Sequence, residues 1–339
     1  MALEATLDYA IATLTDGSQV RTPFWHMDSG RAGESFMVLA AQHGNEVQGC
    51  EVIRRFREVC AQGLRAGEVF LVPFANLPAV RHRRSHISLG PEQPYGDDEG
   101  HNMNRTWPGD PEGNDTARVS HSLHEAVARH CSRCLDFHSW SRFTATATLA
   151  RSDNEHSTAM ARASAIRFIN WRPGGGNPGG GTTIGAHFNN DPARGAITIE
   201  LAPQWVIRPK EVAEGLCAAT NCAKLFGMLD GEPEPLDGPY VEFGLDAEAD
   251  EARLHKLEAP CAGLFMEAGL QTSDRVDEGQ FLGHLIREDD LATVEFHAPV
   301  TGYLWNYGCF REHSDVGLPG QHPWADAGDL LASVREPQE

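Results

Sequence analysis

The segment that most constrains the fold is a short stretch where an apolar run meets a histidine and a glutamate. Phe36–Ala41 is apolar throughout, which is typical of a buried strand, and Glu46 begins the pattern of an amphipathic helix. His43 and Glu46 thus stand three residues apart across a strand-to-helix turn, close enough to bind one metal ion. Gly44 would relax this turn, and Gly49 would let the helix pack close to the strand.

A catalytic zinc ion typically takes three protein ligands and keeps a fourth position for water, so His43 and Glu46 predict a third ligand. His138 fits, because it interrupts the end of the apolar strand Leu135–Trp140. A lone histidine there is more often structural, but a His-x-x-Glu motif elsewhere favours the ligand interpretation. Asp136 lies on the same face of the strand, where it would orient a ligand histidine. We expect one Zn²⁺ per chain, bound by His43, Glu46 and His138.

A hydrolytic zinc site also needs a general base that takes a proton from the attacking water. Glu200 is the candidate, because it is the one acid in the apolar strand Ala196–Ala202. A buried charge is costly unless it has a partner or a function, and the alternative is a salt-bridged strand end. A second histidine cluster, His121-x-x-His124-Glu125, lies within a helical pattern and lacks the His-Glu-x-x-His order. We interpret it as a solvated helix face.

The rest of the chain alternates strand and helix patterns up to residue 230, which predicts an α/β domain with a mixed sheet flanked by helices. The other expected elements are strands at Glu68–Phe74 and Thr144–Ala150 and helices at Glu46–Ala61, Thr116–Arg133, Asn154–Arg167 and Lys210–Met228. The composition of residues 231–239 predicts a linker. Residues 240–339 have the short strands and Gly/Pro turns of a smaller β-rich module. Within it, Ala259–Phe265 and Ala298–Leu304 form a weak repeat, which predicts a small barrel or sandwich.

Composition excludes several classes of function. The net charge of −20 argues against nucleic acid or an anionic membrane as a partner, and an anionic substrate would need a locally basic pocket. No run is long and apolar enough to span a bilayer, and the first residues lack a signal-peptide layout. The eight cysteines show no secreted disulfide pattern, so we expect reduced thiols and a cytoplasmic location. The glycine-rich residues 174–181 lack a phosphate-loop ending and would form a flap or a plain flexible loop.

Four motifs in this order resemble the succinylglutamate desuccinylase/aspartoacylase family, which has a zinc carboxypeptidase-like fold. They are His43-Gly-Asn-Glu46, Asn104-Arg105-Thr-Trp-Pro-Gly109, Asp136-Phe-His138 and Ile199-Glu200. The resemblance covers residues 35 to 205, and a β-rich C-terminal module is also typical of the family. It implies zinc bound by the ligands named above and Glu200 as general base. It also implies that Asn104 and Arg105 grip the carboxylate of the substrate.

The resemblance further implies an arginine that polarises the scissile carbonyl. A guanidinium aimed at a developing oxyanion stabilises charge that exists only in the tetrahedral intermediate. Arg84 is our choice, because it precedes Asn104 in the same long loop. Arg83 is the alternative, since the insertion 88–100 leaves the alignment of this loop with the family open by one residue. Many relatives carry aspartate two residues before the Asn-Arg pair, where it would support a zinc histidine; here Asn102 occupies that position.

The leading hypothesis is a zinc-dependent amidohydrolase, a deacylase that acts on an N-acyl amino acid or a similar small amide bearing a carboxylate. A zinc carboxypeptidase that acts on peptides is the alternative within enzymes. The alternatives outside enzymes are a binding protein that keeps the fold without the chemistry and a metal-free structural protein. We expect a small-molecule substrate, and a homo-oligomer is compatible with the sequence.

Overall fold

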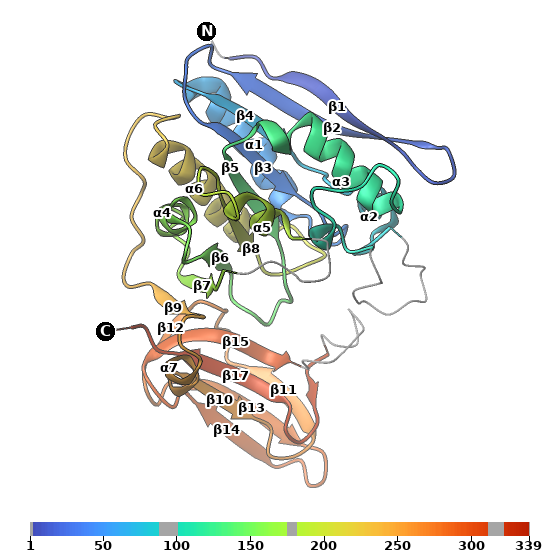
Figure 1. The fold of residues 1–339 in the computed structure, drawn as a ribbon. Helices are drawn as coiled ribbons and strands as arrows, with labels where there is room; N and C mark the ends of the chain where they lie inside the picture. The colour runs from blue at the N-terminus through green and yellow to red at the C-terminus, as the bar shows by residue number, and fades with distance from the viewer. Residues whose placement is uncertain (1–2, 88–100, 175–181, 311–321, 339) are drawn as a thin grey trace.

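In the computed structural model the chain forms a large α/β part and a smaller β part that lies beside it (Figure 1). The structure describes residues 3–87, 101–174, 182–310 and 322–338. The insertion 88–100 and most of the expected glycine-rich flap, residues 175–181, lie outside the described residues. The architecture confirms the predicted fold class, a mixed sheet flanked by helices with antiparallel sheets in the C-terminal part.

Within the described residues, nine strands form one sheet in the order β1-β2-β4-β3-β5-β8-β6-β7-β9. They are β1 (Thr6–Thr13), β2 (Gln19–Asp28), β3 (Ser35–Ala40), β4 (Glu68–Val72), β5 (Arg133–His138), β6 (Ala147–Arg151), β7 (Phe168–Arg172), β8 (Gly195–Glu200) and β9 (Val241–Phe243). The central strands β4, β3, β5 and β8 are parallel, whereas β6 runs antiparallel to β8. Parallel strands end at one edge of a sheet, so the residues at the carboxyl ends of β3, β5 and β8 come together there.

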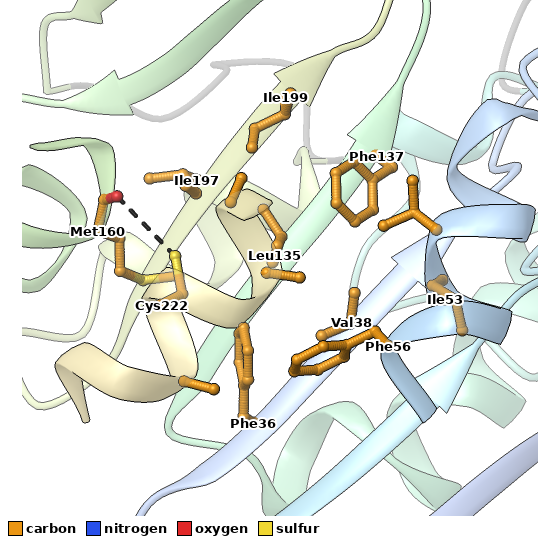
Figure 2. Packing of buried hydrophobic residues seen from close by; sticks show 14 of the residues in the cluster. Phe36, Val38, Ile53, Phe56, Leu135, Phe137, Met160, Ile197, Ile199 and Cys222 are labelled. Atoms are coloured by element: carbon orange, nitrogen blue, oxygen red, sulfur yellow. Dashed lines mark hydrogen bonds between the residues drawn. The ribbon is translucent and has the colours of Figure 1, made fainter. Parts of the chain in front are cut away.

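Helices cover both faces of this sheet. They are α1 (Gln48–Gly63), α2 (Leu77–His82), α3 (Asp115–Ala126), α4 (Glu155–Ala163), α5 (Ile184–Asn189) and α6 (Pro209–Leu225), with short 3₁₀ helices η1 (Met103–Arg105) and η2 (Ala128–His130). Phe36 and Val38 of β3 pack in the core shared with α1, α4 and α6 (Figure 2), and Met37 and Leu39 pack in the core shared with α3 and α5. Burial on both faces explains the uninterrupted apolar run of this strand.

Three of the expected helices extend too far, and one of them, expected over Lys210–Met228, ends at Leu225. The helix expected over Asn154–Arg167 ends at Ala163, and residues 168–172 form the strand β7, which was not predicted from the sequence. Ala165 has φ of 57°, a left-handed conformation that turns the chain from helix into strand. The helix expected over Thr116–Arg133 likewise ends at Ala126, where η2 leads into β5. Apolar periodicity alone does not show such a turn.

The C-terminal part contains two four-stranded antiparallel sheets within the described residues, in the orders β10-β17-β15-β12 and β14-β13-β11-β16. Their bounds are β10 (Leu254–Glu258), β11 (Gly263–Glu267), β12 (Arg275–Val276), β13 (Phe281–Arg287), β14 (Thr293–His297), β15 (Gly302–Phe310), β16 (Trp324–Ala325) and β17 (Leu330–Arg335), and α7 (Ala247–Ala252) precedes them. The two copies of the weak repeat lead into β11 and β15, one in each sheet. The division at residues 231–239 stays a prediction; β9 follows it and pairs with β7 of the large sheet.

Strand β15 contacts the segment between β5 and β6, close to the carboxyl end of β5. The backbone N–H of Ala145 donates to the carbonyl oxygen of Trp305 (2.8 Å), and that of Tyr307 donates to the carbonyl oxygen of Phe143 (2.9 Å). The rings of Trp305 and Trp140 pack edge to face with centroids 5.5 Å apart. The C-terminal part therefore supports the loop that follows His138.

Candidate active site

Two glycines let the first motif reach its position. A Cβ atom on Gly44 would lie 2.2 Å from the carbonyl carbon and oxygen of Ala79, so α2 can approach this turn only because residue 44 has no side chain. A Cβ atom on Gly49 would lie 2.4 Å from the Cβ of Phe137 and 2.8 Å from that of Ala40. The predicted close packing at Gly49 is confirmed, and Gly44 serves the same purpose. Helix α1 begins at Gln48, two residues later than expected.

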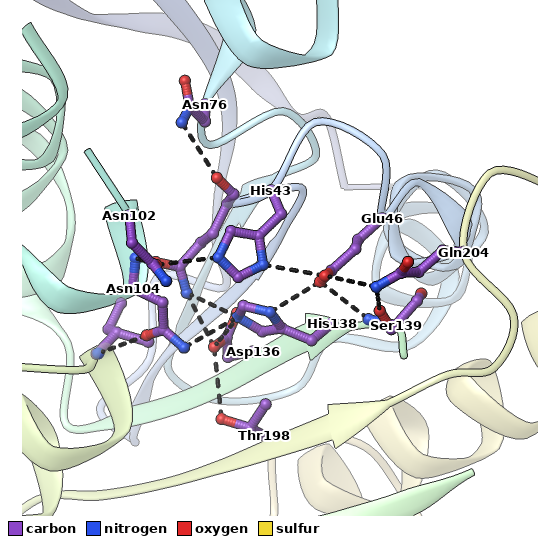
Figure 3. Close-up of polar contacts among 12 residues, drawn as sticks. His43, Glu46, Asn76, Asn102, Asn104, Asp136, His138, Ser139, Thr198 and Gln204 are labelled. Atoms are coloured by element: carbon purple, nitrogen blue, oxygen red, sulfur yellow. Dashed lines mark hydrogen bonds and ion pairs between the residues drawn. The ribbon is translucent and has the colours of Figure 1, made fainter. Parts of the chain in front are cut away.

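The three expected ligands converge at the carboxyl edge of the sheet. The Nδ1 atom of His43 lies 3.0 Å from one carboxylate oxygen of Glu46, and the Nδ1 atom of His138 lies 2.9 Å from the other (Figure 3). One ligand atom from each residue falls within 4.8 Å of the others, which is a geometry that could hold a metal ion. Two imidazoles and one carboxylate are the donor set of catalytic zinc sites that keep an open position for water.

The far nitrogen of each imidazole meets an oxygen acceptor. Asn102 Oδ1 lies 3.0 Å from His43 Nε2, and Asp136 Oδ2 lies 2.9 Å from His138 Nε2. An acceptor at Nε2 favours the tautomer whose proton is on Nε2, which leaves the Nδ1 lone pair for a metal. The amide nitrogens of Gln42 and Asn104 also lie 3.2 and 3.3 Å from His138 Nε2, and the arrangement as a whole is compatible with the donor chemistry of a zinc site.

The histidines and carboxylates of this cluster shift each other's pKa values. Burial lowers the pKa of His138, but the carboxylates of Asp136 and Glu46 outweigh it and hold the pKa well above its usual value. Burial raises the pKa of Glu46, whereas His43 and His138 lower it by more, so this carboxyl stays ionised. The cluster therefore carries a carboxylate aimed at the position where a cation would bind.

Glu200 closes β8 directly beside His138, its register partner on β5. Burial, together with the nearby charges of Glu46 and Asp136, raises the pKa of Glu200 to about 7 although the two histidines act in the opposite direction. A carboxyl whose pKa lies near neutrality can both accept and release a proton, and a cation bound next to it would lower this pKa. The position and the electrostatics are those a general base requires.

A cavity of about 670 Å³ opens over these residues. Asn104 and Arg105 of η1 line it together with His43, Glu46, His138 and Glu200. Asn104 Nδ2 lies 3.3 Å from His138 Nε2, and its Oδ1 accepts a hydrogen bond from the backbone N–H of Ile184 (3.2 Å). The structure thus brings the predicted substrate-binding pair next to the predicted ligands.

Arg83 and Arg84 lie apart from the cavity lining. Arg83 caps the end of α2 with φ of 56° and is exposed, and Arg84 is half-buried with its backbone against the turn at Gly44. Neither residue is among those that line the cavity. The assignment of an arginine to the reacting carbonyl therefore stays a prediction.

Several residues at the site were not predicted from the sequence. Gln42 is fully buried; its amide donates to Asp136 Oδ2 (2.9 Å), and its oxygen accepts from the indole N–H of Trp107 (2.7 Å). Gln204 donates to Glu46 Oε1 (3.3 Å), and Arg151 and Arg172 line the far part of the cavity. The one sequence feature that could have pointed to any of these residues is the polar Gln42 directly after an apolar strand. The others follow from tertiary contacts alone.

The interpretation of the second histidine cluster as a solvated face is wrong for one residue. His124 is only 18% exposed, and its ring packs against that of His187 on α5 with centroids 5.1 Å apart. Periodicity could not reveal this contact, because α5 was not expected from the sequence. The pair lies between α3 and α5 and contributes no cavity-lining residue.

Comparison with known proteins identifies the family of this chain. The sequence model of the succinylglutamate desuccinylase/aspartoacylase catalytic domain matches residues 32–226. The chain is 26% identical over 289 residues to the N-alpha-acetyl-L-2,4-diaminobutyric acid deacetylase of Halomonas elongata, covering 80% of this chain and 77% of that protein.

Two solved structures share the fold over nearly the whole chain. A succinylglutamate desuccinylase/aspartoacylase from Rhodobacter sphaeroides superimposes with a TM-score of 0.67 at 19% identity, covering 99% of this chain and 96% of that one. The product-bound ectoine utilization protein EutE (DoeB) from Ruegeria pomeroyi gives 0.66 at 18% identity, covering 99% and 95%. The chain belongs to the succinylglutamate desuccinylase/aspartoacylase family, a family of deacylases.

Proposed function

We propose that this chain is a zinc-dependent deacylase that releases the acyl group of a small N-acyl amino acid or a similar amide bearing a carboxylate. The observation that carries the proposal is the convergence of His43, Glu46 and His138 beside Glu200 in one cavity. Membership of a deacylase family supports the reaction class. The Halomonas elongata relative, named as a deacetylase of an acetylated diamino acid, supports a small substrate.

The metal ligands and Glu200 would have separate roles in the reaction. A zinc ion held by His43, Glu46 and His138 would supply Lewis acidity, which polarises the scissile carbonyl and makes the attacking water more acidic. The carboxylate of Glu200 would take the proton from that water and later deliver it to the nitrogen of the leaving amine. Each proton accepted is returned, so Glu200 ends the cycle as it began.

Asn104 and Arg105 would hold the carboxylate of the substrate. A guanidinium presents a fork of donors that matches a carboxylate, and the amide of Asn104 adds a further donor. Arg84, or Arg83 as the alternative, remains proposed for the oxyanion. Neither side chain lines the cavity in this structure, so this role requires that the guanidinium reach the oxyanion from outside the lining. Arg105 does line the cavity, which supports its proposed role in holding the carboxylate.

We also keep the expected setting as part of the proposal: a cytoplasmic enzyme of small molecules with no nucleic-acid or membrane partner. In the part of the chain that the structure describes, none of the helices combines the length and the apolar character that a membrane crossing requires. All eight cysteines fall within the described residues, and none of them forms a disulfide.

The test combines metal depletion with a substrate panel. Purified protein is depleted with dipicolinate, titrated with Zn²⁺ and assayed for released amine with N-formyl-, N-acetyl- and N-succinyl-amino acids and one dipeptide. We expect hydrolysis of at least one N-acyl amino acid, loss of activity on depletion and recovery at one Zn²⁺ per chain. Cleavage of the dipeptide alone would favour the carboxypeptidase alternative, and activity that survives full depletion would refute zinc dependence.

A paired substitution isolates the general base. Glu200→Gln should lower kcat by about 10²–10⁴-fold while zinc content stays at one per chain, because the glutamine keeps the shape and cannot accept the proton. Glu214→Gln is the matched control, since Glu214 is another carboxyl whose burial raises its pKa, and it lies on α6 away from the cavity. Equal losses in the two variants would argue against the role of Glu200.

A further inference from the structure

We infer that two copies of this chain associate through the edge strand β1, which pairs antiparallel with the same strand of the second copy. This association is independent of the proposed function. Strand β1 is an outermost strand of the nine-stranded sheet, and Figure 1 shows it along the outer edge of the large α/β part. The length of this edge, its exposed apolar side chains and its charge pattern all point to a second copy as the partner.

Strand β1 is a long and regular edge. Its eight residues, Thr6–Thr13, pair with β2 in one continuous register without a bulge. Across the described residues, the other strands at sheet edges have only two to five residues; they are β9, β10, β12, β14 and β16. Proteins usually protect a long edge with a lysine, a proline or a bulge, because its free backbone groups can pair with another strand. Strand β1 has none of these three features.

The backbone groups that β1 turns outward belong to its odd-numbered residues. The N–H of Tyr9 donates to Oδ1 of the neighbouring Asp8 (2.7 Å), so it points away from the ladder with β2. Alternate residues of an antiparallel strand face the same edge, so Leu7 and Ile11 also direct their N–H and C=O groups outward. A row of outward N–H and C=O groups is the surface to which a further strand adds.

The side chains of the same residues form an apolar stripe. Leu7 is 52% exposed, Tyr9 37% and Ile11 50%. Ala10 and Ala12, on the other face of the strand, are buried in the core that β1 shares with α3. Only one face of β1 is therefore covered within the chain, and an exposed apolar stripe on the other face is typical of an interaction surface.

This stripe is complementary to itself in one register. Opposite residues of an antiparallel pair share a face, so a twofold pair centres on one residue. A centre at Tyr9 sets the two Tyr9 rings opposite each other and Leu7 opposite Ile11 of the second copy. A centre at Asp8 would oppose two carboxylates, and a centre at Ala10 would set Leu7 opposite a threonine. We therefore expect the register centred on Tyr9.

Charge also favours this edge as the contact between two copies. The chain has a net charge of −20, so most surfaces of two copies repel each other. The one acid of β1, Asp8, lies on the face opposite the stripe. Two arginines flank the stripe: the guanidinium of Arg21 lies 4.5 Å from the ring centroid of Tyr9, and that of Arg57 lies 4.8 Å from the ring centroid of Trp25. Cations at this position reduce the repulsion between two acidic copies locally.

The first test measures the mass of the whole chain against its concentration. A single strand pair is a small interface, and interfaces below about 1,200 Å² are typical of transient association. Sedimentation from about 1 to 100 µM should therefore show exchange between monomer and dimer. Ile11→Lys should weaken the dimer by about tenfold or more, because the ammonium would lose its water against Leu7 of the second copy. Leu245→Lys is the matched control, since Leu245 is 63% exposed and lies outside β1, and it should leave the association unchanged.

A cysteine cross-link tests the register. Tyr9→Cys places two thiols across the twofold axis, where the Cα atoms of a hydrogen-bonded pair lie about 5.5 Å apart, within reach of a disulfide. Thr13→Cys is the control on the same strand, because its two copies would lie about 27 Å apart. Oxidation should give a covalent dimer of Tyr9→Cys only, and neither Thr13→Cys nor the parent chain with its eight native cysteines should form one.

Three results would overturn the inference, and none of them depends on hydrolysis. A parent chain that stays monomeric at about 100 µM, with no covalent dimer of Tyr9→Cys, would exclude a second copy and leave the edge to a strand of another protein. A dimer that Ile11→Lys does not weaken would place the contact elsewhere on the chain. Equal cross-linking of Tyr9→Cys and Thr13→Cys would refute the register centred on Tyr9.

Discussion

Gln42 offers the sharpest test of how the site is built. Its side chain is fully buried and joins two groups that are themselves buried, the indole N–H of Trp107 and the carboxylate of Asp136. Asp136 in turn holds Nε2 of His138 at 2.9 Å. Gln42 therefore acts on the expected metal ligand His138 in two ways, through Asp136 and through its own amide nitrogen, which lies 3.2 Å from Nε2 of His138.

Gln42→Leu keeps the approximate size of the side chain and removes its hydrogen bonds with Trp107 and Asp136 and its contact with His138 Nε2. Each buried polar group left without its partner costs about 1–3 kcal/mol, and more when the group is charged, so the free energy of unfolding should fall by about 2–6 kcal/mol. For a domain of this size that corresponds to a drop in Tm of roughly 5–15 °C. Loss of a residue that orients a ligand histidine typically weakens metal binding by about 10- to 100-fold.

The assay is competition for Zn²⁺ against a chromophoric chelator, combined with thermal unfolding. Gln48→Leu is the matched control, because Gln48 is also fully buried, donates to the carbonyl oxygens of Leu201 and Pro203 (3.2 and 3.0 Å) and accepts from the N–H of Arg208 (3.0 Å). It should lose comparable stability and keep its zinc affinity. If Gln42→Leu binds Zn²⁺ within twofold of the parent chain, or if both variants weaken binding equally, the positioning argument is refuted.

Three further predictions concern zinc, His187 and Gly49. Depletion of zinc should lower Tm, since a ligand present at a thousandfold excess over its Kd stabilises the folded state by about 4 kcal/mol; a Tm that does not respond to Zn²⁺ in scanning fluorimetry would contradict the metal site. Burial lowers the pKa of His187 to about 4, so the unfolded chain takes up this proton near pH 6.5 while the folded chain does not, and stability falls as the pH drops from 6.5 towards 4. His187→Gln should flatten that part of the stability profile in urea unfolding, whereas the exposed His130→Gln should not, and identical profiles for both variants would count against this assignment. Gly49→Ala places a Cβ atom 2.4 Å from that of Phe137 and should cost about 1–3 kcal/mol of stability, and an unchanged urea midpoint would show that α1 can move away without cost.

Much of the fold was predictable because its signals are local. The uninterrupted apolar run of β3 is buried on both faces, and the polar residues that follow β3 and close β5 and β8 lie at the carboxyl edge of a parallel sheet. That geometry follows from strand direction alone, so the sequence is sufficient to place His43, His138 and Glu200 together. The element ends were less predictable, since the turn at Ala165 leaves no trace in the apolar pattern.

The sequence by itself supplied the candidate residues for the proposed chemistry: two imidazoles and a carboxylate as donors, an acid at the end of a buried strand, and an Asn-Arg pair beyond a long loop. The tertiary structure decided which groups surround that set. Gln42 gains its role only because Trp107 and Asp136 meet it from distant segments, and Arg172 faces the cavity only because β7 pairs with β6. Motifs report residues a few positions apart, whereas supporting contacts and specificity depend on which strands become neighbours, and non-local packing sets that order.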